Sequence, residues 1–231
     1  YEGCRTAISD WYNDVAFNGS NNFNELAEAD VFDSIHDLAA QLINVNPTDI
    51  AVGSSATELL SSLAWAIAPK KGENIISTDI VFPSTVYPWQ RVANATGATL
   101  KLAQCKDDYL DPDDIVKLMD QQTAVVCISH VEYGNGQLFD LEKLSDAAHA
   151  VGALFIIDAT QSAGAIPIDG NTVAIDGLVC SAYKWLCGPF GAAIMYLNPK
   201  LQHNLEPGLV GFRSHKDMWK PVSYTHLTLP P

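Results

Sequence analysis

Seven short apolar runs alternate along the chain with segments of helical periodicity, and this alternation restricts the fold more than any other feature. The runs read DIAVGSS, NIISTDI, ATLKLAQ, TAVVCISHV, ALFIIDAT, IDGLVCSA and GAAIMYL. Strands that alternate with helices form layered α/β domains, and near-continuous apolar strands indicate a sheet that is covered on both faces. The sequence therefore predicts a three-layer α/β/α fold around a mostly parallel, seven-stranded sheet.

The segments between these runs carry the start and stop signals of helices. One helix is predicted to begin at Asp30 as its cap and to carry four apolar side chains on one side: Val31, Ile35, Leu38 and Leu42. Another is predicted to end at Gly97, and a third to be capped by Asp111 with Pro112 in its first turn. No internal repeat or low-complexity linker interrupts the pattern, so we expect one domain to hold most of the chain.

The composition of the chain narrows the class of its partners. Of the 231 residues, 48% are hydrophobic and 17% are charged, which suits a globular domain with a sizeable core. Acidic residues outnumber basic ones 27 to 13, and the formal charge of -14 opposes binding to nucleic acid or to an anionic membrane surface. We therefore expect a small-molecule partner, with no nucleic acid and no membrane.

We expect the sequence to be part of a longer protein, because the chain begins without methionine and in the middle of a helical pattern. We assign residues 1–200 to a large domain with an incomplete N-terminus, residues 201–222 to the start of a truncated C-terminal domain, and residues 223–231 to a non-native tail. No basic and apolar leader stands at the start, and no apolar run reaches the roughly 18 to 20 residues that cross a bilayer. A cytoplasmic location is the prediction.

The five cysteines favour reduced thiols over disulfides or a metal centre. They form no CxxC pair, and Cys127 and Cys180 lie inside apolar strand-like runs, where a thiol packs as a small apolar side chain. We expect buried, reduced cysteines and no metal site.

Residues with useful chemistry follow three of the predicted strands, where ligands of open α/β sheets collect. The segment VGSSATELL places small residues and hydroxyls before a helix, as an anion cradle or as an ordinary helix cap. The run FIIDATQ delivers Asp158 at a strand end, where its carboxylate meets a cation or caps a turn. The segment SAYKWLCGPFG holds Lys184, which is either a nucleophile activated by desolvation and cationic neighbours or a surface lysine with a buried stem.

Together these three features favour one cofactor, pyridoxal 5'-phosphate. This cofactor requires a carboxylate for its ring nitrogen, an amine for its aldehyde and a site for its phosphate. Asp158, Lys184 and the turn before Ala56 would supply the three.

Five segments carry a family resemblance: VGSSATE, VFPSTVYPWQ, CISHVEYGNGQLFDLEKL, DATQSAGAIPID and SAYKWLCGPFG. In order and spacing they resemble class V aminotransferase-fold enzymes, the group that includes cysteine desulfurases, selenocysteine lyases, isopenicillin N epimerase-like proteins and kynureninase. The resemblance implies the large domain of a fold type I pyridoxal-phosphate transferase, which acts as a homodimer on a small amino-acid substrate.

Carried over residue by residue, the resemblance implies the following cofactor site. Lys184 would be catalytic, because it would form a Schiff base with the cofactor's aldehyde and move the proton at the substrate's α-carbon. Asp158 would pair with the ring nitrogen, and Gln161 would reach the phenolic oxygen. The phosphate and the ring face would be held by the remaining cofactor-binding residues: Ala56, Thr57, Ser181 and Tyr183 for the phosphate, and Phe82 for the ring.

Some positions depart from the desulfurase pattern. Phe82 and Tyr183 stand where desulfurases usually have histidine; the phenyl group can stack on a ring but cannot exchange protons, and the tyrosine still offers a donor to phosphate. Cys187 directly follows the lysine, whereas desulfurases carry their sulfur-accepting cysteine far downstream, so we assign it no catalytic role. Which of residues 132–135, if any, contacts the cofactor stays open.

Two further stretches have open roles. His130 ends a strand near the expected site, as a structural or a catalytic histidine. Arg213, His215 and Lys216 would present cations to a substrate carboxylate or to a partner subunit, or would belong to a solvated connector.

The sequence thus predicts an enzyme that acts on an amino acid by transamination, by cysteine desulfurase or lyase-type elimination, or by epimerisation. A nicotinamide-dependent dehydrogenase would share the alternating strands, but no GxGxxG follows the first strand. A non-catalytic or inactive binding module on the same fold is the alternative.

Overall fold

The computed structural model describes residues 1–211 and residue 214. Its centre is a sheet of seven strands: β1 (Ile50–Gly53), β2 (Asn74–Thr78), β3 (Thr99–Ala103), β4 (Thr123–Ser129), β5 (Leu154–Asp158), β6 (Gly177–Ser181) and β7 (Ala193–Leu197). The predicted seven-stranded sheet is confirmed. Residues 212–213 and 215–222 of the predicted second-domain segment and the whole predicted tail, with Arg213, His215 and Lys216, lie outside the described residues.

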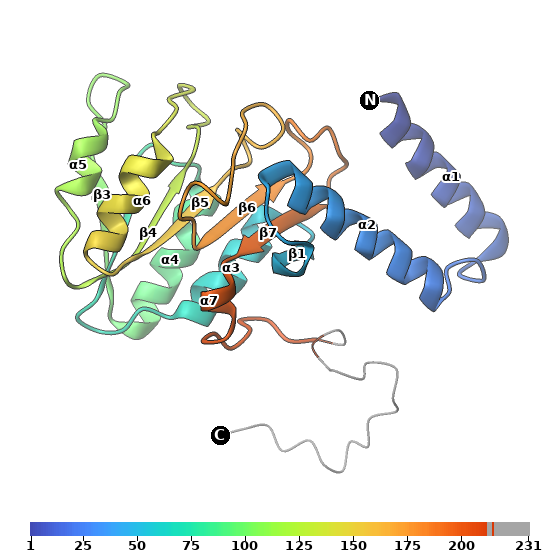
Figure 1. Ribbon diagram of the computed structural model, residues 1–231, viewed down its shortest axis with the longest axis horizontal. Coiled ribbons are helices and arrows are strands. Elements are labelled where there is room, and N and C mark those ends of the chain that lie inside the picture. Colours follow the sequence, from blue (N-terminus) through green and yellow to red (C-terminus); the bar gives the residue numbers. More distant parts are fainter. Residues whose placement is uncertain (212–213, 215–231) are drawn as a thin grey trace, which may run out of the picture.

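The strands lie in the order β1-β7-β6-β5-β4-β2-β3 (Figure 1). Neighbouring strands from β6 to β3 run parallel, while β7 is antiparallel to both β6 and β1, which confirms a mostly parallel sheet. The chain winds from β2 to β3 in one direction and from β4 through β5 to β6 in the other. Such a reversal, here between β2 and β4, opens a crevice at the carboxyl ends of the strands.

Helices cover both faces of the sheet, so the three-layer α/β/α architecture is confirmed (Figure 1). One face is covered by α3 (Ala56–Ile67) and α4 (Pro83–Thr96). The other is covered by α5 (Pro112–Val116), α6 (Leu141–Ala150) and the last turn of α2 (Glu25–Ile43). The remaining elements are α1 (Glu2–Asn18), the 3-10 turn η1 (Pro47–Asp49) and α7 (Pro199–Gln202).

Successive side chains of the central strands point to opposite faces of the sheet and pack in two separate hydrophobic cores. Ile75 and Val125 pack beneath α3 and α4, whereas Ile76 and Val126 pack beneath α5 and α6, and all four are fully buried. A sheet buried on both faces needs apolar side chains at consecutive positions, which explains why the strands appear in the sequence as continuous apolar runs.

Two of the predicted helix ends are confirmed. Gly97 follows α4 with φ of 84°, in the left-handed region that glycine adopts without steric penalty. Asp111 caps α5, because its side chain accepts a hydrogen bond from the N–H of Asp113, and Pro112 occupies the first turn.

The predicted start of α2 is wrong. The helix begins at Glu25, and Asp30 lies inside it. The cap is Asn24, whose side chain accepts hydrogen bonds from the N–H groups of Leu26 and Ala27.

The apolar stripe predicted for this helix is also mostly exposed, since 65% of Leu38 is accessible to solvent and Val31 and Leu42 are exposed as well. The helix enters the core only through residues near its end: Ala39, Ala40 and Ile43. Helical periodicity shows which side chains share a face, but it does not show whether another element covers that face.

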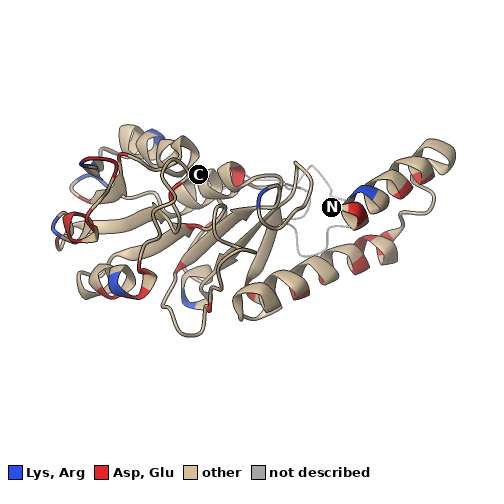
Figure 2. Ribbon diagram, turned by 90° about the horizontal axis from the view of Figure 1, so that it is seen from above, with Lys and Arg blue, Asp and Glu red and all other residues tan. Residues whose placement is uncertain are grey.

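Acidic residues outnumber basic ones on the two N-terminal helices, which extend away from the sheet (Figures 1 and 2). α2 contains five acidic residues and no Lys or Arg, and α1 has no buried residue. Part of the excess of negative charge therefore lies on these two helices.

All five cysteines are free. Cys127 and Cys180 are buried as predicted, but Cys4, Cys105 and Cys187 are partly exposed, so the prediction of burial is wrong for these three. Among the described residues, no helix is long and apolar enough to cross a membrane, and no group of three or more His, Cys, Asp or Glu is placed to hold a metal ion.

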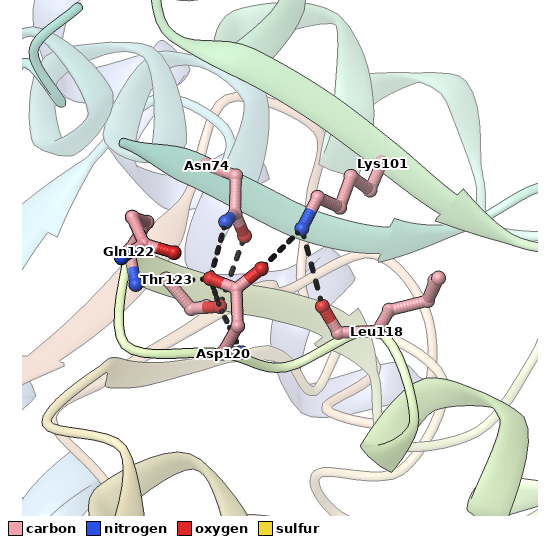
Figure 3. A network of polar contacts seen from close by, with 6 residues as sticks. All are labelled: Asn74, Lys101, Leu118, Asp120, Gln122 and Thr123. Carbon is pink, nitrogen blue, oxygen red and sulfur yellow. Dashed lines mark hydrogen bonds and ion pairs between the residues drawn. The ribbon is translucent and has the colours of Figure 1, made fainter. Parts of the chain in front are cut away.

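A polar network joins the amino-terminal ends of β2 and β4 to β3, at the edge opposite the crevice (Figure 3). The Asp120 carboxylate accepts hydrogen bonds from Lys101 Nζ over 2.7 Å, from Asn74 Nδ2 over 2.8 Å and from the N–H of Gln122 over 2.9 Å. These donors, Lys101 above all, lower the pKa of Asp120 to about 2.

Asp120→Asn is expected to lower the thermal midpoint at neutral pH, because it removes the charge that pairs with Lys101. The pKa of Asp120 in the folded chain lies below that of an unfolded aspartate, about 3.9. Its ionised form therefore stabilises the fold above about pH 4, and this contribution is lost as the pH falls toward 2. Thermal denaturation of both chains should show a gap in midpoint that narrows below about pH 4, whereas a gap of constant size would contradict this role.

Candidate active site

The predicted site residues follow the carboxyl ends of parallel strands. Ser129 ends β4 and Asp158 ends β5, and the strand register places them side by side. Ser181 ends β6, and Phe82 lies between β2 and α4. These segments border the crevice where the direction of winding reverses.

One pocket at this edge is lined by five segments of the chain. Its cavity volume is about 90 Å³, and it opens to solvent. All eight predicted site residues line it: Ala56, Thr57, Phe82, Asp158, Gln161, Ser181, Tyr183 and Lys184. The structure thus brings the predicted residues together, while the role of each toward a cofactor stays a prediction.

The N-terminus of α3 supplies backbone N–H groups at one side of the pocket. Ser55 caps the helix by accepting a hydrogen bond from the N–H of Glu58, and the N–H of Ala56 donates to Ser181 Oγ over 2.9 Å. No described residue accepts a hydrogen bond from the N–H of Thr57. Since a helix N-terminus attracts negative charge, Thr57 offers both its N–H and its hydroxyl to an anion.

Asp158 is buried, with 6% of its surface exposed, and each carboxylate oxygen accepts a hydrogen bond. Thr85 Oγ1 donates to Oδ2 over 2.8 Å, and the N–H of Thr160 donates to Oδ1 over 2.9 Å. Asp158 therefore caps the turn after β5 and also lines the pocket. Its contacts in the described part of the chain are with neutral donors, so a cationic group of a ligand would complete its surroundings.

Lys184 lies in the turn after β6, and its side chain is exposed. Its Nζ lies 5.6 Å from the centroid of the Tyr183 ring, and its carbonyl accepts a hydrogen bond from the N–H of Cys187. The sequence left open whether Lys184 is desolvated or lies at the surface. In the structure it lies at the surface, because the turn lies at the open rim of the pocket. The Lys184 amine is therefore not desolvated in this structure.

Gly164 lies where the loop after β5 meets the turn that carries Lys184. Its φ is +90°, and a Cβ added to it would stand 2.8 Å from the carbonyl oxygen of Trp185 and 3.0 Å from Leu186 Cδ2. Only glycine fits both the backbone conformation and this close approach.

Gly164→Ala is therefore expected to lower the free energy of unfolding by about 1 to 3 kcal/mol. Gly191→Ala is the matched control, because Gly191 has a similar φ of +89° but nothing within 4 Å of its added Cβ. Urea denaturation should show the larger loss for Gly164→Ala. Equal losses would mean that the close approach to Trp185 adds nothing to the backbone strain.

Aromatic side chains border the pocket on several loops. Phe82, 43% exposed, meets Tyr133 edge to face, with ring centroids 5.2 Å apart and an interplanar angle of 83°. Tyr183 stacks on Phe190 at 4.7 Å. An exposed phenyl ring in the lining can stack on a planar ligand.

Sequence reasoning did not find five of the lining residues: Ser84, Ser129, Val131, Tyr133 and Thr160. Ser129, Val131 and Tyr133 alternate along β4 and its continuation, so the two-residue period of a strand was a signal for them. Of residues 132–135, the one that lines the pocket is Tyr133.

His130 and Glu132 occupy the intervening positions and are not part of the pocket lining. Burial lowers the pKa of His130 to about 4 and raises the pKa of Glu132 to about 7. Glu132 Oε1 accepts a hydrogen bond from Thr78 over 3.2 Å. Cys187 also lies outside the lining.

A family model described as aminotransferase class-V matches residues 4–226. The chain is 28% identical over 201 residues to the uncharacterized aminotransferase YcbU of Bacillus subtilis, covering 87% of this chain and 53% of the relative. It is 29% identical over 204 residues to a probable cysteine desulfurase of Synechocystis, covering 86% and 47%. The chain thus spans about half the length of the curated relatives it matches.

The fold also resembles that of a solved C-DES variant with glycine covalently linked to its PLP cofactor. The TM-score is 0.82 at 22% identity, over 91% of this chain and 57% of the other. At this level of identity the likeness shows a shared fold.

Proposed function

The chain belongs to the aminotransferase class-V family, and on this premise we propose that it binds pyridoxal 5'-phosphate in the pocket described above and acts on an amino acid. The proposal rests on one observation: all the predicted site residues line the same pocket. An acid, an amine and a helix N-terminus, which are far apart in the sequence, border one pocket, and a pocket with a few convergent polar groups is where a small molecule is expected to bind.

The donor set of the pocket fits the three ends of the cofactor. Asp158 is buried among neutral donors, which suits a protonated ring nitrogen. The N–H and hydroxyl of Thr57, with the hydroxyl of Ser181, suit a phosphate. Lys184 supplies an amine for the aldehyde. When bound, the cofactor withdraws electrons from the bonds to the substrate's α-carbon.

The side chains of the pocket have separate tasks in this proposal. Asp158 holds the proton on the ring nitrogen, and Gln161 donates to the phenolic oxygen. Lys184 binds the aldehyde and moves the proton at the substrate's α-carbon. Phe82 covers the ring face and excludes water, but it cannot exchange protons. Ala56 and Tyr183 complete the phosphate side, although the N–H of Ala56 donates to Ser181 in this structure.

Among the possible reactions, the names of the relatives favour two: transamination, and the elimination of a cysteine desulfurase. The first substrates to test are therefore L-cysteine, with a thiol reductant present so that the removed sulfur is released as sulfide for the readout, and pairs of an amino acid and a 2-oxo acid. Since Cys187 lies outside the pocket lining, sulfide release would not depend on its thiol.

The partner in this proposal is a second copy of the chain, as the family resemblance implies. Exposed apolar side chains on the N-terminal helices support it, Phe17 and Leu26 among them. A molar mass from light scattering that matches one chain would exclude this dimer. The division at residue 200 and the cytoplasmic location stay predictions.

The proposal is tested by mixing the purified chain with pyridoxal phosphate and reducing the mixture with borohydride. Peptide mass spectrometry should then find the cofactor's mass on the peptide that contains Lys184. A chain that is folded by circular dichroism yet retains no cofactor would refute the proposed function.

A further inference from the structure

Thr85 is fully buried next to the pocket, and its side chain contacts Asp158, the acid in the pocket lining. The residue is not part of the lining, but its Oγ1 donates to Asp158 Oδ2 over 2.8 Å. Thr85 belongs to the first turn of α4, and its N–H donates to the carbonyl of Phe82 over 2.8 Å. One residue therefore joins the segment that carries the phenyl ring to the carboxylate at the end of β5.

The same carboxylate begins a chain of hydrogen bonds to the far side of the pocket. Asp158 Oδ1 accepts from the N–H of Thr160, and Thr160 Oγ1 accepts from the N–H of Ser181 over 3.1 Å. Ser181 Oγ in turn accepts from the N–H of Ala56. The contacts run from α4 across the ends of β5 and β6 to the N-terminus of α3, so both ends of the pocket are tied to one carboxylate.

We propose that Thr85 is a positioning residue that acts through Asp158, holding the carboxylate where the ring nitrogen of pyridoxal phosphate meets it. This inference rests on the proposed function. Donors on both oxygens stop the carboxylate from rotating and still leave lone pairs for a ligand. Without the threonine hydroxyl, Oδ2 loses its donor in a buried place, and the carboxylate is free to turn away from the ring.

The test compares two ligands, pyridoxal phosphate and its deaza analogue, in which a carbon replaces the ring nitrogen. Thr85→Val removes the hydroxyl and nearly keeps the shape, and it should weaken binding of pyridoxal phosphate about tenfold. Binding of the deaza analogue should change far less, since that ligand has no nitrogen for Asp158. Thr85→Ser keeps the hydroxyl and should restore the affinity for pyridoxal phosphate.

Thr78→Val is the matched control. Thr78 is equally buried and also donates to a buried carboxylate, that of Glu132, but neither residue lines the pocket. Thr78→Val should bind both ligands as the wild type does. A loss of similar size in Thr78→Val would assign the effect to general loosening of the fold.

The outcomes separate this inference from the proposed function. If wild-type chain binds neither ligand, the proposed function fails and the role of Thr85 fails with it. If wild type binds pyridoxal phosphate and Thr85→Val binds it equally well, the inference alone is overturned. Equal weakening of both ligands in Thr85→Val would also overturn it, because the hydroxyl would then act on the helix and not through Asp158.

Discussion

Lys184→Ala is expected to abolish covalent attachment of pyridoxal phosphate and to slow turnover of an amino-acid substrate by about a hundredfold or more. The substitution removes the only lysine that lines the described pocket, and with it the group proposed to move the proton at the α-carbon. Borohydride reduction followed by peptide mass spectrometry measures the attachment, and a steady-state assay measures the turnover.

Lys70→Ala is the control for this experiment. Lys70 is exposed on the loop before β2, at the edge of the sheet opposite the pocket, and its loss should leave attachment and turnover as they are. Undiminished attachment of the cofactor to the Lys184→Ala chain would contradict the assignment of position 184.

Asp158→Asn is expected to weaken binding of pyridoxal phosphate by about tenfold to a hundredfold. The substitution keeps the shape of the side chain but removes the charge that pairs with the protonated ring nitrogen. A hydrogen bond to a charged group contributes about 1.5 to 3 kcal/mol, which corresponds to this range. Equilibrium titration, followed by the absorbance of the bound cofactor, measures the change.

Asp176→Asn is the matched control for Asp158→Asn. Asp176 is a largely buried aspartate with two donors of its own, His149 Nε2 and the N–H of Phe155, but it lies before β6, at the edge opposite the pocket. Its substitution should change stability and leave cofactor affinity as it is. Equal weakening by the two substitutions would mean that the affinity reflects fold stability and not a contact with the ring.

The sheet was predictable from the sequence because its strands are buried on both faces. Consecutive apolar residues such as Ile75 and Ile76 are typical of a strand that is covered on both faces, and the turn signals at Gly97 and Asp111 limit the helices between the strands. The antiparallel direction of β7 was not predictable, because apolar runs show burial and not the direction of the chain.

Helix α2 shows where local pattern is insufficient. Asp30 is as good a capping residue as Asn24, and only the backbone path decided that Asn24 caps the helix. The exposure of Leu38 depends on the absence of a covering element in the described chain, which the periodicity of the helix itself cannot reveal.

The pocket was predictable because its residues follow directly after strands whose carboxyl ends meet. The local environment of each side chain was harder to predict from the sequence. The exposure of Lys184 follows from the path of a turn, and the hydrogen bond from Thr85 to Asp158 joins two segments that no sequence motif links. Tyr133 continues the two-residue period of β4 beyond the end of the strand, and this period places it on the same side as Ser129 and Val131.

The most direct measurement is a crystal structure of the chain with pyridoxal phosphate. The proposal predicts a ring nitrogen within hydrogen-bond distance of Asp158, an aldehyde carbon bonded to Lys184 Nζ, and a phosphate against the N-terminus of α3. A cofactor bound elsewhere, or bound with its ring nitrogen turned away from Asp158, would contradict the assignment of this pocket.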